Sequence, residues 1–93
     1  MLHKKADPAG LARALRVMRN QRNLSICTVV ERMLTQYGVK RTRQSVYQHE
    51  AGARIPTADT VEAYCRVYNL NTDDARRLYE LAGYVVIFSG EDA

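Results

Sequence analysis

Apolar residues recur every three or four positions along most of the chain, which is the spacing of one face of an α-helix. A residue type that caps helix N-termini precedes each segment with this spacing, and glycine or asparagine follows most of these segments. The pattern therefore predicts five short helices. The expected inward positions are Leu11, Leu15 and Met18; Val29, Val30, Met33 and Leu34; Val46; Val61, Tyr64, Cys65 and Tyr68; and Leu78, Leu81 and Ala82.

The third predicted helix, Arg43–Ala51, differs from the others because it is short and polar, with Val46 as its only strongly apolar residue. Thr42 is placed to cap its N-terminus, and Gly52 stands where a left-handed C-terminal cap is needed. The other N-terminal caps are expected at Asp7, Ser25, Thr57 and Asn71.

The segment Tyr84–Phe88 breaks the helical spacing. It is β-branched, aromatic and apolar on both faces, which favours a strand. We therefore expect an all-α fold of five helices with a short C-terminal strand or an extended tail. Residues 1–83 are expected to form one domain and residues 84–93 an apolar tail.

Charge is divided unevenly along the 93 residues. Residues 1–56 carry eleven Lys and Arg against three acids, a net +8, whereas residues 57–93 carry three Arg against seven acids, a net −4. A basic face of this kind favours a polyanionic partner such as nucleic acid. No apolar run approaches the ~18 residues of a membrane span, so a cytoplasmic, nucleoid-associated protein without membrane contact is expected.

The chain offers little for catalysis or metal binding. His3 and His49 are too few and too scattered for a zinc site, and Cys27 and Cys65 have no Cys or His at ligand spacing. Both cysteines lie within helical apolar patterns and are expected to be small, reduced core residues. No nucleophile–base set or phosphate loop stands out, so no enzyme, metal, cofactor or small-molecule ligand is expected.

Two short helices joined by a tight turn, the second polar and within the basic half, are typical of a helix-turn-helix. Four motifs occur in order: Leu24-Ser25, Glu50-Ala51-Gly52, Pro56-Thr57 and Leu81-Ala82-Gly83-Tyr84. With these motifs, residues 15–84 resemble the Cro/phage-repressor (XRE) family. The resemblance implies that residues 1–83 are a helix-turn-helix DNA-binding domain.

The resemblance also implies a structural ion pair between Arg19 of the first helix and Glu50 of the third. The alternative is an exposed pair that adds little stability. The chain departs from the family in two places. The stretch 34–46 is about two residues longer than the usual connection, and Ile26 stands where members often carry a phosphate-binding Gln. His49 occupies a position usually filled by an aromatic or apolar residue, so we expect half-buried packing there.

With Val46 facing inward, helical spacing puts Arg43, Gln44, Tyr47 and Gln48 on the open side of the third helix. The resemblance implies base reading from Arg43, Gln44 and Gln48, since arginine can pair with guanine and glutamine with adenine. Tyr47 either touches a thymine methyl or a phosphate, or only packs. Phosphate contacts are expected from Lys40, Arg41, Thr42, Ser45 and Arg54.

These features predict a sequence-specific regulator, a repressor, that binds double-stranded DNA as a homodimer on a palindromic operator. The expected dimer interface is the tail, namely Tyr84, Val85, Val86, Ile87 and Phe88. Alternatively, the tail folds back over its own fourth and fifth helices. A second class of function also stays open: a helix-turn-helix protein-interaction module, or an antitoxin-type regulator, that acts through a protein partner.

Overall fold

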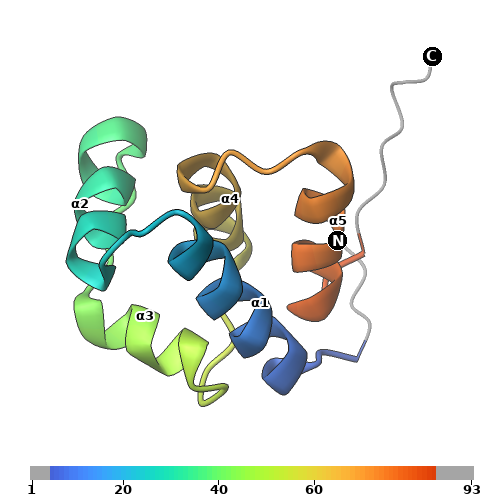
Figure 1. Cartoon of the computed structure of the whole chain (residues 1–93). Coiled ribbons are helices and arrows are strands. Elements are labelled where there is room, and N and C mark those ends of the chain that lie inside the picture. Colours follow the sequence, from blue (N-terminus) through green and yellow to red (C-terminus); the bar gives the residue numbers. More distant parts are fainter. Residues whose placement is uncertain (1–4, 86–93) are drawn as a thin grey trace.

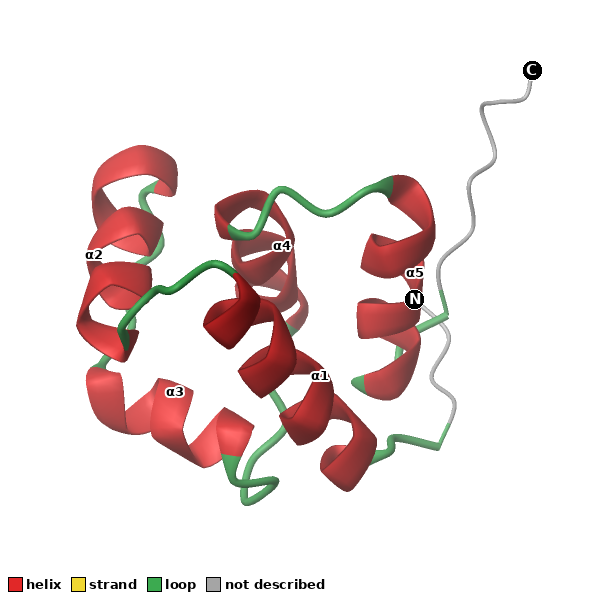
Figure 2. Ribbon diagram, in the orientation of Figure 1, coloured by secondary structure: helices red, strands yellow, loops and turns green. Residues whose placement is uncertain are grey.

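The structure, a computed structural model, describes residues 5–85. All regular secondary structure in this range is helical, and the described residues form no strand (Figure 2). The prediction of an all-α fold with five helices is confirmed. The helices are α1 (Pro8–Gln21), α2 (Ile26–Tyr37), α3 (Arg43–Glu50), α4 (Ala58–Val67) and α5 (Thr72–Leu81).

The helices are arranged with α1 and α4 between the two ends of the molecule (Figure 1). α1 packs against α3 and α5, α2 packs against α3 and α4, and α4 packs against α5. α2 and α3 therefore lie at one end and α5 lies at the other. The hydrophobic side chains that are at most 1 % exposed come from every helix and form the core: Leu11, Leu15, Val29, Met33, Val46, Val61, Ala63, Tyr64, Tyr68 and Leu78.

Side-chain caps begin four of the five helices at the predicted residues. Oxygen atoms of Asp7, Ser25, Thr42 and Asn71 accept hydrogen bonds from the backbone N–H groups of Gly10 (3.0 Å), Thr28 (3.0 Å), Ser45 (3.1 Å) and Asp74 (2.8 Å). Thr57 makes no such bond at the start of α4, and its hydroxyl lies 3.1 Å from that of Thr60. The first N–H groups of α4 therefore lack a side-chain cap, which leaves them open to another acceptor.

The connection between α2 and α3 spans residues 38–42. α2 continues to Tyr37, and Gly38 ends it with a φ of 69°, a left-handed conformation that favours glycine. The N–H groups of Gly38 and Val39 donate to the carbonyls of Leu34 (3.0 Å) and Met33 (2.9 Å), which closes the last turn. Val39 then packs against the core before the chain enters α3.

Two expected core positions on α2 are wrong. Leu34 is 49 % exposed, and Cys27 is also exposed. The buried residues of α2 are Ile26, Val29 and Met33, which form one stripe. Leu34 and Cys27 lie to the same side of this stripe by helical geometry, and no neighbouring helix covers that side, because α2 packs only against α3 and α4.

The tail prediction falls mostly outside the described residues, which end before residues 86–88. Tyr84 lies in a single β-bridge, and its N–H donates to the Tyr79 carbonyl at 3.0 Å in the turn that ends α5. Its side chain packs against the core, and its hydroxyl donates to the Pro56 carbonyl at 3.3 Å. The prediction of a strand or an extended tail is therefore untested for residues 86–88, while the Tyr84 side chain packs onto its own chain.

Candidate nucleic-acid interface

α3 has one buried face and one open face. Val46, His49 and Glu50 are buried, and their spacing follows one side of the helix. The open face carries the four side chains that helical spacing predicts there. They are Arg43, Gln44 and Tyr47, which are exposed, and Gln48, which is half-buried. Three hydrogen-bonding side chains and an aromatic ring that is 61 % exposed thus share one surface.

A bidentate ion pair holds the end of α3 against α1. Arg19 Nε lies 2.8 Å from Glu50 Oε2, and Arg19 Nη2 lies 2.9 Å from Glu50 Oε1. Arg19 Nη1 also donates to the Leu24 carbonyl at 3.0 Å, and Arg16 donates to the backbone carbonyl of Glu50. The hydrogen bond to Glu50 raises the pKa of Arg19. The pair that the family resemblance implies is therefore present and mostly shielded from solvent, with the side chains 19 % and 6 % exposed.

A second buried contact holds α3 against α4. His49 Nδ1 lies 2.8 Å from the Tyr64 hydroxyl, and the two rings meet edge to face. Burial, together with the positive charges of Arg54 and Arg41, lowers the pKa of His49 to about 4. His49 is therefore a neutral residue at pH 7, and it is more deeply buried, at 4 % exposed, than the half-buried packing expected.

Replacing Tyr64 and Tyr68 by Phe is expected to have different effects on the free energy of unfolding. Tyr64→Phe leaves the buried Nδ1 of His49 unsatisfied, which costs about 1–3 kcal/mol. The Tyr68 hydroxyl is buried without a hydrogen-bond partner among the described residues. Tyr68→Phe is therefore expected to be neutral or stabilising by up to about 1 kcal/mol. Urea unfolding measures both values, and equal losses would contradict the pairing of His49 with Tyr64.

Arginines lie at both ends of the open face. Arg43 is the first residue of α3, and its Nη1 lies 3.6 Å from the Cys27 sulfur of α2. Arg54 follows α3, and its Nη1 lies 3.4 Å from Gln48 Oε1. Both contacts are exposed and long, so either guanidinium can exchange its partner for a charged acceptor at little cost.

A basic hollow of about 260 Å³ lies beside α3 and the start of α4. Its lining includes Arg41, Ser45, Arg54 and Thr57. Arg41 Nε donates to Thr60 Oγ1 at 2.7 Å, which holds this side chain against α4. Two guanidinium groups thus meet a helix start that lacks a side-chain cap, and this arrangement suits an anion.

The other predicted phosphate ligands surround the start of α3. Lys40 is exposed in the loop before it. The hydroxyls of Thr42 and Ser45 lie 3.0 Å apart, and the Thr42 oxygen also caps the helix. Since one hydroxyl of this pair donates to the other, a single O–H donor is left for an outside acceptor.

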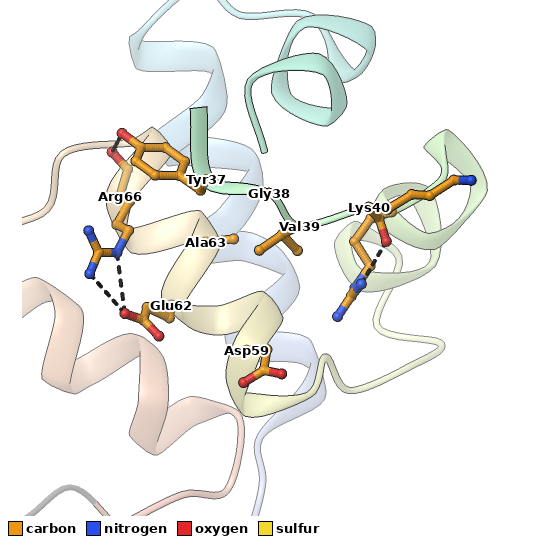
Figure 3. Close-up of a pocket in the computed structure, with 9 residues that line it drawn as sticks. Tyr37, Gly38, Val39, Lys40, Asp59, Glu62, Ala63 and Arg66 are labelled. Atoms are coloured by element: carbon orange, nitrogen blue, oxygen red, sulfur yellow. Dashed lines mark hydrogen bonds and ion pairs between the residues drawn. The ribbon is translucent and has the colours of Figure 1, made fainter. Parts of the chain in front are cut away.

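A larger hollow of about 510 Å³ lies between the end of α2, the α2–α3 loop and α4 (Figure 3). Residues 37–39 form one wall, and side chains of α4 form the other. On the α4 side, Arg66 is paired with Glu62 at 3.0 Å. The Lys40 side chain extends away from α4 (Figure 3). The α2–α3 connection therefore builds this hollow and presents Lys40 outward from it.

Sequence reasoning missed three residues that support the site. Arg16 lies one turn before Arg19 in a row of arginines spaced three positions apart, and this spacing is a usable signal for the contact of Arg16 with α3. Cys27 lies outside the apolar stripe of α2, and this position in the helical pattern indicates that its side chain is exposed. The exposed sulfur lies beside Arg43. Tyr64 is correctly expected in the core, but no feature of the linear pattern links it to His49.

Two other features are absent along residues 5–85. Within that range, no three His, Cys, Asp or Glu side chains gather where they could hold a metal ion. No helix of the same range has the length and apolar character needed to cross a membrane.

The family model described as "Helix-turn-helix domain" matches residues 10–78, which is more than half of the chain. No curated protein and no solved structure matches the chain. The matched range runs from the first turn of α1 into α5 and includes the whole interface around α3. This is consistent with the resemblance to the Cro/phage-repressor family. The chain therefore belongs to the helix-turn-helix domain family, which indicates a DNA-binding regulator.

Proposed function

We propose that the protein is a sequence-specific transcriptional regulator that binds double-stranded DNA and inserts α3 into the major groove. The observation that carries this proposal is the polar, basic open face of a helix whose opposite face is tied to α1 and α4 by buried contacts. Firm attachment supports base reading because the side chains must stay aligned with the base edges.

The base readers in this proposal are Arg43, Gln44 and Gln48. Arg43 can donate two hydrogen bonds to O6 and N7 of guanine, and either glutamine can pair with N6 and N7 of adenine. Tyr47 then packs against a thymine methyl or the sugar–phosphate backbone. The eight residues of α3 span about 12 Å, which is comparable with the ~12 Å width of the major groove.

Phosphates on either side of the groove would be bound by residues that flank α3. Arg41 and Arg54, with the uncapped start of α4, provide one phosphate site in the basic hollow. Lys40 and the spare O–H group of the Thr42–Ser45 pair provide contacts near the start of α3. These contacts orient the domain, and they carry no sequence information by themselves.

The finer part of the proposal is a repressor that acts as a homodimer on the nucleoid in the cytoplasm. A single α3 contacts only a few base pairs, so two copies related by a twofold axis would read half-sites about one helical turn, ~34 Å, apart. The apolar tail that follows Tyr84, residues 85–88, would join the two copies. Occupation of a palindromic operator would then block transcription.

Duplex binding is expected to weaken steeply with salt. Each neutralised phosphate lowers the slope of log affinity against log salt by about 0.9. With contacts from Lys40, Arg41 and Arg54, we expect a slope near −3 per domain and a decrease in its magnitude of roughly 1 in Lys40→Ala. Fluorescence anisotropy with a labelled duplex measures the slope. Arg66→Gln, at an exposed position outside the interface, is the matched control and should leave the slope unchanged.

Arg43→Ala and Arg54→Ala are expected to weaken binding in different ways on an operator selected from a random duplex library. Arg43→Ala should reduce the free energy of operator binding by about 1–3 kcal/mol and relax the sequence preference at one base pair. Arg54→Ala should weaken all duplexes alike, because a phosphate contact is independent of sequence. Competition with single-base operator variants separates the two effects. If both variants lose affinity equally for all duplexes, α3 is not the element that recognises the bases.

If the domain is instead a protein-interaction module, the opposite result is expected from the same random duplex library. A domain that acts through a protein partner selects no duplex, even at low salt, and its Arg43→Ala variant keeps the wild-type function. Selection of a palindrome would instead support dimeric binding to an operator.

A further inference from the structure

The hollow between the end of α2, the α2–α3 loop and α4 has a volume of about 510 Å³, which lies within the ~300–1,000 Å³ range of small-molecule sites. Val39 of the loop and Ala63 of α4 point toward one another at its base (Figure 3). The Tyr37 ring also lines it, and a Cβ at Gly38 would meet no atom within 4 Å. The hollow therefore has apolar walls and open space beside the loop.

Five charged residues line this hollow, namely Lys40, Arg41, Asp59, Glu62 and Arg66. Two of them neutralise each other, because the Arg66 guanidinium donates to Glu62 Oε2 at 3.0 and 3.2 Å. The Lys40 side chain extends away from α4 (Figure 3). The charges that remain for a ligand are therefore the carboxylate of Asp59 and the guanidinium of Arg41.

Asp59 and Arg41 do not pair with each other, although both line the hollow. The guanidinium donates to the Thr60 hydroxyl at 2.7 Å and to the Lys40 carbonyl at 2.6 Å, and both acceptors are uncharged. In the described part of the chain, the Asp59 carboxylate makes no ion pair and no hydrogen bond. An acid and a base thus border the same space, each without a charged partner among residues 5–85.

We propose that this hollow binds a small zwitterion of the amino-acid type, with its ammonium group at Asp59 and its carboxylate at Arg41. The guanidinium keeps N–H groups for a carboxylate, which is the acceptor it binds best. Glu62 Oε1, which accepts no described hydrogen bond, provides a second acceptor for the ammonium group. The side chain of the ligand lies against the apolar walls. The linear pattern predicts no such ligand, because only the fold brings these groups together.

Arg41 couples this hollow to DNA binding, because it lines both the larger hollow and the basic hollow beside α3. The coupling rests on the function proposed above, in which Arg41 binds a phosphate. A ligand carboxylate takes the same guanidinium, so the ligand and the duplex compete, and each weakens the binding of the other by the same factor. The zwitterion is therefore expected to release the protein from DNA.

The first test measures ligand binding without DNA. The standard amino acids are added one at a time to the full-length protein, and the melting temperature is recorded. We expect at least one of them to raise the melting temperature and, in calorimetry, to bind with a dissociation constant of about 1 mM or less. The amide of that amino acid should bind at least about tenfold more weakly, because it lacks the carboxylate charge.

Asp59→Asn removes the partner of the ammonium group and should also weaken ligand binding at least about tenfold. Asp74→Asn is the matched control. Asp74 is likewise an exposed acid in the first turn of a helix, but it lines a different feature, a groove of about 410 Å³ between α1 and α5 with apolar side chains from both helices. It should bind the ligand like the wild type, and circular dichroism should show that both variants are folded.

Three results of this titration would overturn the site. They are the absence of binding by any amino acid below about 10 mM, unchanged binding in Asp59→Asn, and equal binding of the amino acid and its amide.

The second measurement adds the ligand to the protein bound to a labelled duplex. Saturating ligand should weaken duplex binding at least about fivefold in the wild type and leave Asp59→Asn unaffected. A ligand that binds but does not change the duplex affinity contradicts the coupling through Arg41. If the protein binds no duplex at all, the proposed function fails, whereas the titration without DNA still tests the hollow, so the two failures are distinguishable.

Discussion

Replacing Arg19 by Met is expected to lower the free energy of unfolding by about 3–5 kcal/mol, because it leaves a buried carboxylate without its partner. The Glu50 side chain is only 6 % exposed, and Arg19 supplies both of the side-chain hydrogen bonds described for its carboxylate oxygens. Met preserves much of the apolar volume of the Arg side chain, so the loss reports mainly on the charge and its hydrogen bonds. Urea unfolding at pH 7 measures the effect.

The exposed pair between Glu62 and Arg66 offers the matched control. These side chains are 53 % and 58 % exposed and lie 3.0 Å apart in an i,i+4 arrangement, so Glu62→Gln should change stability by no more than about 0.5 kcal/mol. If Arg19→Met costs as little as this control, the Arg19–Glu50 pair does not attach α3 to α1. If the double variant Arg19→Met/Glu50→Gln recovers part of the loss, the cost comes from the unpaired charge.

Stability is expected to fall as the pH is lowered from about 6.5 to about 4, and His49 is the residue responsible. Its pKa in the folded protein is about 4, whereas an unfolded chain has a His pKa near 6.5. Between these values the unfolded state binds a proton that the folded state does not bind, so acid favours unfolding. The contribution of neutral His49 is complete above pH 6.5 and is lost by up to about 3 kcal/mol as the pH reaches 4.

The variant His49→Gln isolates this contribution. Gln can still hydrogen-bond the Tyr64 hydroxyl but does not titrate. The difference in unfolding free energy between wild type and variant should therefore shrink steadily as the pH falls through this window. A difference that stays constant from pH 7 to pH 4 would mean that His49 does not stay neutral in the folded protein.

The local signals of this sequence predict its helices well, because each signal acts within a few residues. The cap residues Asp7, Ser25, Thr42 and Asn71 bond to backbone three positions onward. The open face of α3 is similarly local: once Val46 faces the core, helical geometry turns the adjacent polar residues outward. These features depend on neighbours in the chain, so the linear pattern contains the information they need.

Contacts between segments that are far apart in the chain are not predicted by these local signals. Leu34 is as apolar as the buried residues of α2, yet it is exposed because no other helix covers that side. The Arg41 guanidinium is bound to Thr60, nineteen positions away, and His49 is neutral because the fold buries it against Tyr64 and near two arginines. In these cases burial and charge are set by which elements meet, and no residue type specifies that alone.

The linear pattern predicts the number of helices, the residues at which they begin, the polar face of α3 and, through its motifs, the family. Only the tertiary arrangement determines which arginines bind other side chains and which contacts hold the buried face of α3 against α1 and α4. It also determines where an apolar groove remains between α1 and α5. The reason is physical. Capping and helical periodicity are short-range effects that residue identity largely fixes, whereas desolvation and side-chain pairing depend on the packing of segments far apart in the chain.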